Sequence, residues 1–266
     1  MDKPLLHVFR NTPMGRETLL LSVYLCRQLR LPLDLYLPKE KRFLFYFDSV
    51  VVQVDLDASY LSYPETARQR AEELTKGVGK RRFIKAKSYT ATDLPDLPTG
   101  FSLMTCPRSM SDQTSRIGLG HIGPKVRRIL LHAPFPVMIP SVVYKPWTSI
   151  TVLYGGSPAA AEAVKLALRF QERCQLPLQI ISVGERSALE QTLREQGLLE
   201  QVVGSDWQIH PGNSLVEHLY GIPHDALVVL GAYAHGPIRS LFGSTMELVQ
   251  SQLPQSLVVV GPNYSA

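Results

Sequence analysis

The chain repeats part of its own sequence, and this repeat constrains the fold more than any other feature. Residues 5–37 align with residues 150–182 at a constant offset of 145, which places Thr12 on Ser157 and a proline after each. Each copy has the pattern of a strand, a hydroxyl helix cap, a proline at the first helical position, a helix and a second strand. We therefore expect two copies of one structural unit.

A second block of the repeat follows in the same order. Gly123 aligns with Gly243 at an offset of 120, and residues 136–140 then align with 256–260. Two blocks in one order predict a tandem duplication, with one domain at residues 1–144 and the other at residues 148–266.

The first half carries extra residues in its middle, because the two offsets differ by 145 − 120 = 25. We place them in Lys39–Tyr60, where a run of Phe, Tyr and Val predicts an extra strand or an interface segment. The linker between the halves is short, about Tyr144–Ser149, and predicts halves that pack against each other.

Short apolar runs alternate with helical patterns along both halves. Leu227–Leu230 and Leu257–Val260 are typical of parallel strands that are covered on both faces. Further elements expected in the second half are a helix at Pro158–Arg173 and strands at Leu178–Val183 and Asp206–His210. The alternation predicts an α/β fold with a doubly wound, parallel, five-stranded sheet in each half.

The stretch Leu227–Pro262 contains a loop rich in glycine between its two strands. Gly231, Gly236 and Gly243 free the backbone, and Ser244 and Thr245 open the next helix with hydroxyls beside unpaired N–H groups. This arrangement suits a phosphate at a helix N-terminus. An ordinary helix cap would use the same residues, so both readings remain open.

These features together resemble the universal stress protein family in tandem form. The resemblance rests on the strand that ends at Gly231, on Gly243-Ser244, and on the helix and strand that follow them. It implies five-stranded α/β domains, a homodimer, and ATP, with Mg²⁺, bound at strand ends. Carried to this chain, it assigns nucleotide contacts to the following residues: Tyr154, Gly155, Ser157, Val183, Gly231, Gly236, Gly243, Ser244 and Thr245.

The chain departs from the family pattern at several positions. The family has Asp after the first strand, whereas this chain has Gly155 in one half and Arg10 or Asn11 in the other. In the first half Pro124 replaces the hydroxyl residue and removes a donor N–H. Gly231 and Gly243 are 12 positions apart, where the family has 13. We therefore expect nucleotide binding, if present, in the second half.

Two alternatives to nucleotide binding remain. One is a nucleotide-free interaction module in which the apolar segment Phe43–Val54 is exposed and joins protomers. The other is a nucleotide-hydrolysing enzyme, which is weaker because no general base is identifiable. We expect a binding or regulatory protein rather than an enzyme.

Other patterns add little to this interpretation. Residues 118–123 match a dinucleotide-binding motif formally, but no strand directly precedes them. The basic stretch Lys76–Lys87 predicts a solvated edge strand, although it also suits an anion. The three cysteines and seven histidines show no ligand spacing, and no catalytic residues or metal ligands are assigned.

The overall composition excludes some classes of protein. A content of 45% hydrophobic and 19% charged residues is typical of a globular protein, and no run approaches the ~18 apolar residues of a membrane span. The first residues lack a secretory signal pattern, so a cytoplasmic location is expected. The formal charge of +5 is mild, and nucleic acid is an unlikely partner.

Overall fold

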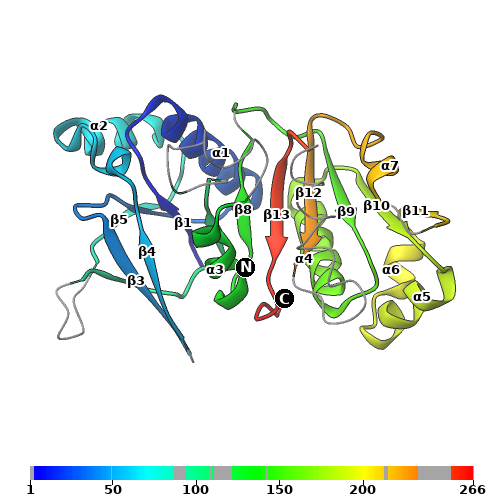
Figure 1. Cartoon of the computed structure of the whole chain (residues 1–266). Coiled ribbons are helices and arrows are strands. Elements are labelled where there is room, and N and C mark those ends of the chain that lie inside the picture. The colour runs from blue at the N-terminus through cyan, green and yellow to red at the C-terminus, as the bar shows by residue number, and fades with distance from the viewer. Residues whose placement is uncertain are drawn as a thin grey trace.

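The computed structural model of the chain (Figure 1) describes residues 3–48, 50–86, 94–107, 110, 122–141, 143–212, 215–232 and 253–265. Within this part of the chain, the strands of the main sheet are β1 (Leu5–Val8), β2 (Leu33–Tyr36), β5 (Arg81–Ile84), β7 (Leu103–Thr105), β8 (Val137–Ile139), β9 (Ser149–Leu153), β10 (Leu178–Val183), β11 (Asp206–His210), β12 (Ala226–Gly231) and β13 (Ser256–Val260). The helices are α1 (Pro13–Leu29), α2 (Pro64–Leu74), α3 (Pro124–His132), α4 (Pro158–Cys174), α5 (Arg186–Glu195), α6 (Leu199–Val203) and α7 (Val216–Leu219), with a short 3-10 helix at Ala58–Leu61.

The sheet is continuous across both halves of the chain. Its ten strands have the order β11-β10-β9-β12-β13-β8-β7-β1-β2-β5. Strands within each group of five run parallel, and only the central pair, β13 with β8, is antiparallel. The α/β class and the parallel order are confirmed, but the two expected sheets form one. The closing strands of the two groups pair with each other, which satisfies edge N–H and C=O groups that would otherwise be unpaired.

Successive side chains along each strand point alternately into two hydrophobic layers, one on each face of the sheet. Val152 of β9 and Val258 of β13 pack in the layer that α1, α2, α4, α5 and α6 cover. Their neighbours Leu153 and Val259 pack in the opposite layer with α3 and α7. Because both faces are covered, the strands consist of nearly continuous apolar residues.

The extra segment of the first half forms a hairpin. Its strands β3 (Arg42–Phe47) and β4 (Val50–Asp55) pair antiparallel, and β6 (Asp96–Leu97) extends them to a separate three-stranded sheet. The expected extra strand is confirmed. The expectation that Phe43–Val54 is an exposed apolar segment is wrong for Phe43, Phe45 and Val54, which are fully buried in the layer that contains α3, whereas Tyr46 and Val51 are exposed.

The two aligned helices, α1 and α4, have the same construction. Both have 17 residues and a proline at the first position. The Thr12 and Ser157 hydroxyls accept hydrogen bonds from the N–H groups of Gly15 and Ala160, at 3.2 and 3.1 Å. Each helix is followed by a C-cap residue with a left-handed backbone, Arg30 after α1 and Gln175 after α4 (φ of 55° and 56°). The expected helix caps are confirmed.

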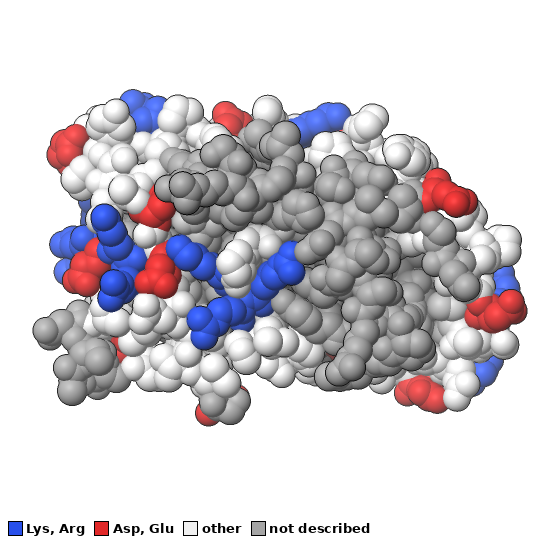
Figure 2. All heavy atoms as spheres, viewed as in Figure 1, with Lys and Arg blue, Asp and Glu red and all other residues white. Residues whose placement is uncertain are grey.

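The basic stretch that begins at Lys76 lies at one end of the sheet. Arg81–Ile84 forms the last strand, β5, which pairs only with β2 in the described part of the chain. This confirms the predicted edge strand. Elsewhere, Figure 2 shows further Lys and Arg side chains gathered over α3, whose sequence contains Lys125, Arg127 and Arg128.

Candidate nucleotide-binding site

The order of strands in the second half creates a point where ligands commonly bind. Strand β9 lies between β10 and β12. The chain proceeds from β9 to β10 on one side and places β12 on the other side. In parallel α/β sheets, such a reversal leaves a crevice beyond the carboxyl ends of the strands. The turn after β9 and the end of β12 lie at this reversal.

Tyr154 follows β9 but its side chain points into the protein interior. It is 2% exposed, and its hydroxyl donates a hydrogen bond to the carbonyl of Leu189 in α5, at 2.9 Å. Burial raises the pKa of Tyr154 to about 12. The side chain therefore anchors α5 beneath the turn, and only the main chain of Tyr154 remains for a ligand.

The rest of this turn is formed by small residues. Gly155 and Gly156 are half-buried, and Gly156 has a left-handed backbone (φ of 76°). The Thr192 hydroxyl donates to the carbonyl of Gly156 at 2.9 Å and fixes the turn against α5. Ser157 is the N-cap of α4, so its hydroxyl has a structural role whether or not a ligand binds.

Gly231 at the end of β12 allows the first turn of α4 to lie directly against the strand. A Cβ atom at this position would be 2.4 Å from the carbonyl carbon of Ala159 and 2.5 Å from the nitrogen of Ala160. Any side chain here would therefore displace the start of α4. Helix–sheet packing is a second reason for a glycine at a position that the resemblance assigns to nucleotide.

Val183, expected to lie at the adenine end, closes β10 and is half-buried. Its register partner in β11 is His210, whose ring stacks on His218 of α7 with centroids 3.7 Å apart. Beneath them, the indole N–H of Trp207 donates to the Ser182 hydroxyl at 3.0 Å. No pattern in the sequence indicates these aromatic neighbours, because no motif joins positions on different elements.

The structure therefore brings Tyr154, Gly155, Ser157, Val183 and Gly231 to one edge of the sheet, at the ends of three adjacent strands. The remaining predicted residues lie outside the described part of the chain: Gly236, Gly243, Ser244 and Thr245. Within the described residues, no group of three His, Cys, Asp or Glu side chains could hold a metal ion.

The corresponding turn of the first half is filled by side chains. Asn11 donates from its amide nitrogen to the carbonyl of Tyr63 and to the Thr66 hydroxyl, at 3.2 and 3.1 Å. Arg10 is 4% exposed, and its guanidinium lies over the Tyr60 ring, 5.4 Å from the centroid. These contacts connect the turn after β1 to α2 and to the residues that precede α2. At the positions equivalent to Arg10 and Asn11, the second half has Gly155 and Gly156.

Comparison with known proteins supports the resemblance. The chain is 27% identical over 182 residues to universal stress protein Slr1230 of Synechocystis sp., and this match covers 64% of the chain and 61% of the relative. The chain thus spans less than two thirds of that relative's length. No family model matches the chain.

Solved structures show that the fold is that of universal stress proteins. A universal stress protein from Archaeoglobus fulgidus superimposes with a TM-score of 0.59 at 15% identity, covering 97% of this chain and 96% of that one. A protein of unknown function from Pseudomonas aeruginosa has the same TM-score at 16% identity, covering 98% and 93%. At such identities the likeness establishes the fold. In the described part of the chain, no helix combines the length and apolar character that crossing a membrane requires.

Proposed function

We propose that the chain is a binding or regulatory protein of the universal stress protein type, and that its second half binds an adenine nucleotide, ATP with Mg²⁺. The observation that carries this proposal is the position of Tyr154, Gly155, Val183 and Gly231 at the switch point of the parallel sheet. Ligands of doubly wound folds bind at this position.

The adenosine end of the nucleotide fits a crevice with few side chains. Gly155, Gly156 and Gly231 are all half-buried, so main-chain groups can approach a ligand closely. Because Gly155 replaces a carboxylate, main-chain groups near Val183 read the adenine edge. In this proposal Gly236, Gly243, Ser244 and Thr245 hold the phosphates and their metal ion.

The first half serves assembly in this proposal. We regard residues 1–144 and 148–266 as duplicated domains, which the equal construction of α1 and α4 supports. In the first half, the Asn11 and Arg10 side chains already contact protein groups at the turn after β1. Nucleotide would therefore bind once per chain.

The test is a thermal shift with millimolar ATP and Mg²⁺, together with native mass spectrometry of the purified protein. A ligand at 100 times its Kd stabilises a protein by ~2.7 kcal/mol, which raises Tm by several degrees. Wild-type protein that shows neither a shift nor a co-purified nucleotide would contradict the proposal.

A substitution at Gly155 examines the adenosine end separately. Gly155→Asp supplies the missing carboxylate, and a hydrogen bond to a charged group contributes ~1.5–3 kcal/mol, so ATP should bind roughly 10- to 100-fold more tightly. Gly155→Asn has the same size without the charge and is the matched control. Equal affinities for the two variants would show that the adenosine does not lie at this turn.

A further inference from the structure

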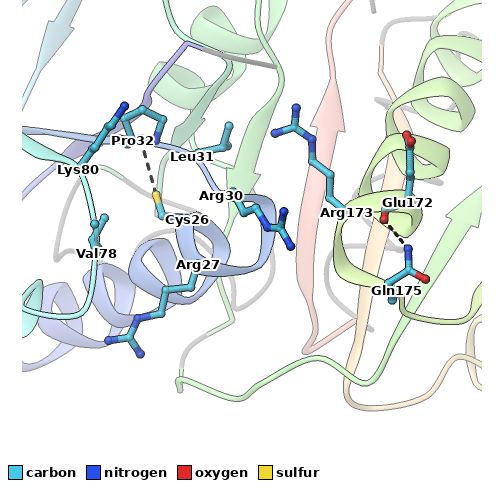
Figure 3. A pocket seen from close by; sticks show the side chains of 11 residues that line it. Cys26, Arg27, Arg30, Leu31, Pro32, Val78, Lys80, Glu172, Arg173 and Gln175 are labelled. Carbon is cyan, nitrogen blue, oxygen red and sulfur yellow. Dashed lines mark hydrogen bonds between the residues drawn. The ribbon is translucent and has the colours of Figure 1, made fainter.

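A cavity lies at the opposite edge of the sheet from the candidate nucleotide site. It has a volume of about 950 Å³ and lies between the C-terminal ends of α1 and α4 and the turn that precedes β5 (Figure 3). Pro32 and Lys80, which line it, directly precede β2 and β5. The cavity is therefore at the amino ends of the strands. It is independent of the proposed nucleotide site.

Positive charge dominates the lining of this cavity. Among the described residues that line it, Arg27, Arg30, Lys80 and Arg173 are basic and Glu172 is acidic, which gives a net charge of 4 − 1 = +3. None of these four cations forms an ion pair in the part of the chain that the structure describes. Two charges come from α1, one from the turn before β5 and one from α4.

Two of the cations are held in place by main-chain carbonyls. Arg27 donates from Nε to the carbonyl of Gly77 at 3.0 Å, and Arg173 donates to the carbonyl of Leu29 at 2.8 Å. The second bond joins the two halves of the chain. The side chains of Arg30 and Lys80 make no hydrogen bond within the described residues, so their charged groups are available to a ligand.

The partial negative charges of the two helix C-termini compensate only part of this positive charge. Arginine at a helix C-terminus is favourable because the terminus carries about half a negative charge. The ends of α1 and α4 together offset about one of the three positive charges. About two positive charges therefore remain without compensation in a concave site, and their mutual repulsion favours an anion there.

A neighbouring cavity, which is also lined by basic residues, differs from this one in the contacts of its cations. It has a volume of about 640 Å³, shares Lys80 with the first, and is also lined by Lys76, Arg81 and Arg82. Arg82 forms an ion pair with the buried carboxylate of Asp34 at 2.6 Å, and Arg81 donates to the carbonyl of Glu72 at 2.7 Å. In the described part of the chain, the larger cavity thus differs in that none of its lining cations is neutralised by an ion pair.

We propose that the cavity between α1 and α4 binds a small polyanion that carries two or more phosphate groups. Its volume lies within the roughly 300–1,000 Å³ of small-molecule sites. Guanidinium groups match phosphate oxygens with two parallel hydrogen bonds. Because Arg30 and Lys80 come from the first half and Arg173 from the second, the ligand bridges the halves and stabilises their contact.

The experiment uses isothermal titration calorimetry of the full chain with sodium tripolyphosphate as the probe. The test variant is Arg30→Gln/Lys80→Gln. Gln175 already occupies the equivalent left-handed position at the end of α4, so glutamine suits the backbone at position 30. We expect binding at a 1:1 ratio in wild type and a loss of at least tenfold in affinity in the variant, with an unchanged circular dichroism spectrum.

A charge-matched control separates a site from general attraction. Lys39→Gln/Lys41→Gln removes the same charge from exposed residues beyond the carboxyl end of β2 and should leave affinity within twofold of wild type. The conservative variant Arg30→Lys/Lys80→Arg should retain most of the binding. The ATP thermal shift should not change in Arg30→Gln/Lys80→Gln, so failure here and failure of the proposed function are distinguishable.

Several results would overturn the assignment: no binding of tripolyphosphate, an equal loss in the test and control variants, or a loss below twofold in the test variant. The third result would place the probe elsewhere, for example at the phosphate end of the nucleotide site. Tighter binding of a single-stranded oligonucleotide than of tripolyphosphate, lost in the same variant, would replace the small ligand with nucleic acid.

Discussion

Gly231→Ala tests the packing that brings the candidate site together. The new Cβ would lie 2.4 Å from the carbonyl carbon of Ala159, whereas ordinary contacts begin at 3.4 Å, so the first turn of α4 must move by at least 3.4 − 2.4 = 1.0 Å. The atoms in the way are main chain and cannot move aside by changing a rotamer. Overpacking costs ~1–3 kcal/mol, and we expect a loss of about 2–3 kcal/mol here.

Urea unfolding followed by circular dichroism measures this loss. With m of about 2–3 kcal/mol/M, the midpoint should fall by roughly 1 M at unchanged m. Gly100→Ala is the matched control, because a Cβ there has no neighbour within 4 Å, and its effect should stay within ~0.5 kcal/mol. A loss below ~0.5 kcal/mol for Gly231→Ala would refute direct contact between α4 and the end of β12.

Two further predictions concern single side chains. Burial, with a smaller effect from Arg10, lowers the pKa of His7 from 6.5 to about 3. Since the unfolded chain takes up the proton first, stability should fall as pH drops below 6.5, by ~1.36 kcal/mol per unit or about 2 kcal/mol at pH 5. Urea unfolding at pH 7 and at pH 5 gives the difference in unfolding free energy between the two pH values, and His7→Gln should reduce this difference by about 2 kcal/mol. An unchanged difference would contradict this prediction. Ser157→Ala should cost ~1 kcal/mol through loss of the α4 cap, while Ser157→Thr should restore most of it in the same assay; equal losses would exclude the cap as the cause.

Local sequence signals predict elements well in this chain. The pattern of hydroxyl, proline and apolar residues at Thr12 and Ser157 gave the starts of α1 and α4, since caps depend on a few neighbouring residues. The strands β10 and β11 also begin and end where the sequence predicts, at Leu178–Val183 and Asp206–His210. Such signals are contained within a few positions, so a single sequence reveals them.

Contacts between residues far apart along the chain cannot be predicted from such local signals. Nothing local indicates that β8 and β13 pair with each other, because their apolar residues suit any neighbour in a covered sheet. The aromatic run in β3 suggests an interface equally well, yet Phe43 and Phe45 pack inside the first half. Similarly, the inward orientation of Tyr154 depends on α5, which lies 35 residues away along the chain at Leu189.

The two halves differ at the turn after their first strand, and this difference bears on where a ligand could bind. In the first half, the Asn11 amide donates to the Tyr63 carbonyl and to the Thr66 hydroxyl, so a side chain occupies this position. In the second half, Gly155 offers no side chain to occupy the same position. A chain with two similar halves can thus fill the turn of one half with side chains and leave the turn of the other half without them. The resulting prediction of one nucleotide per chain separates this arrangement from a symmetric pair of sites.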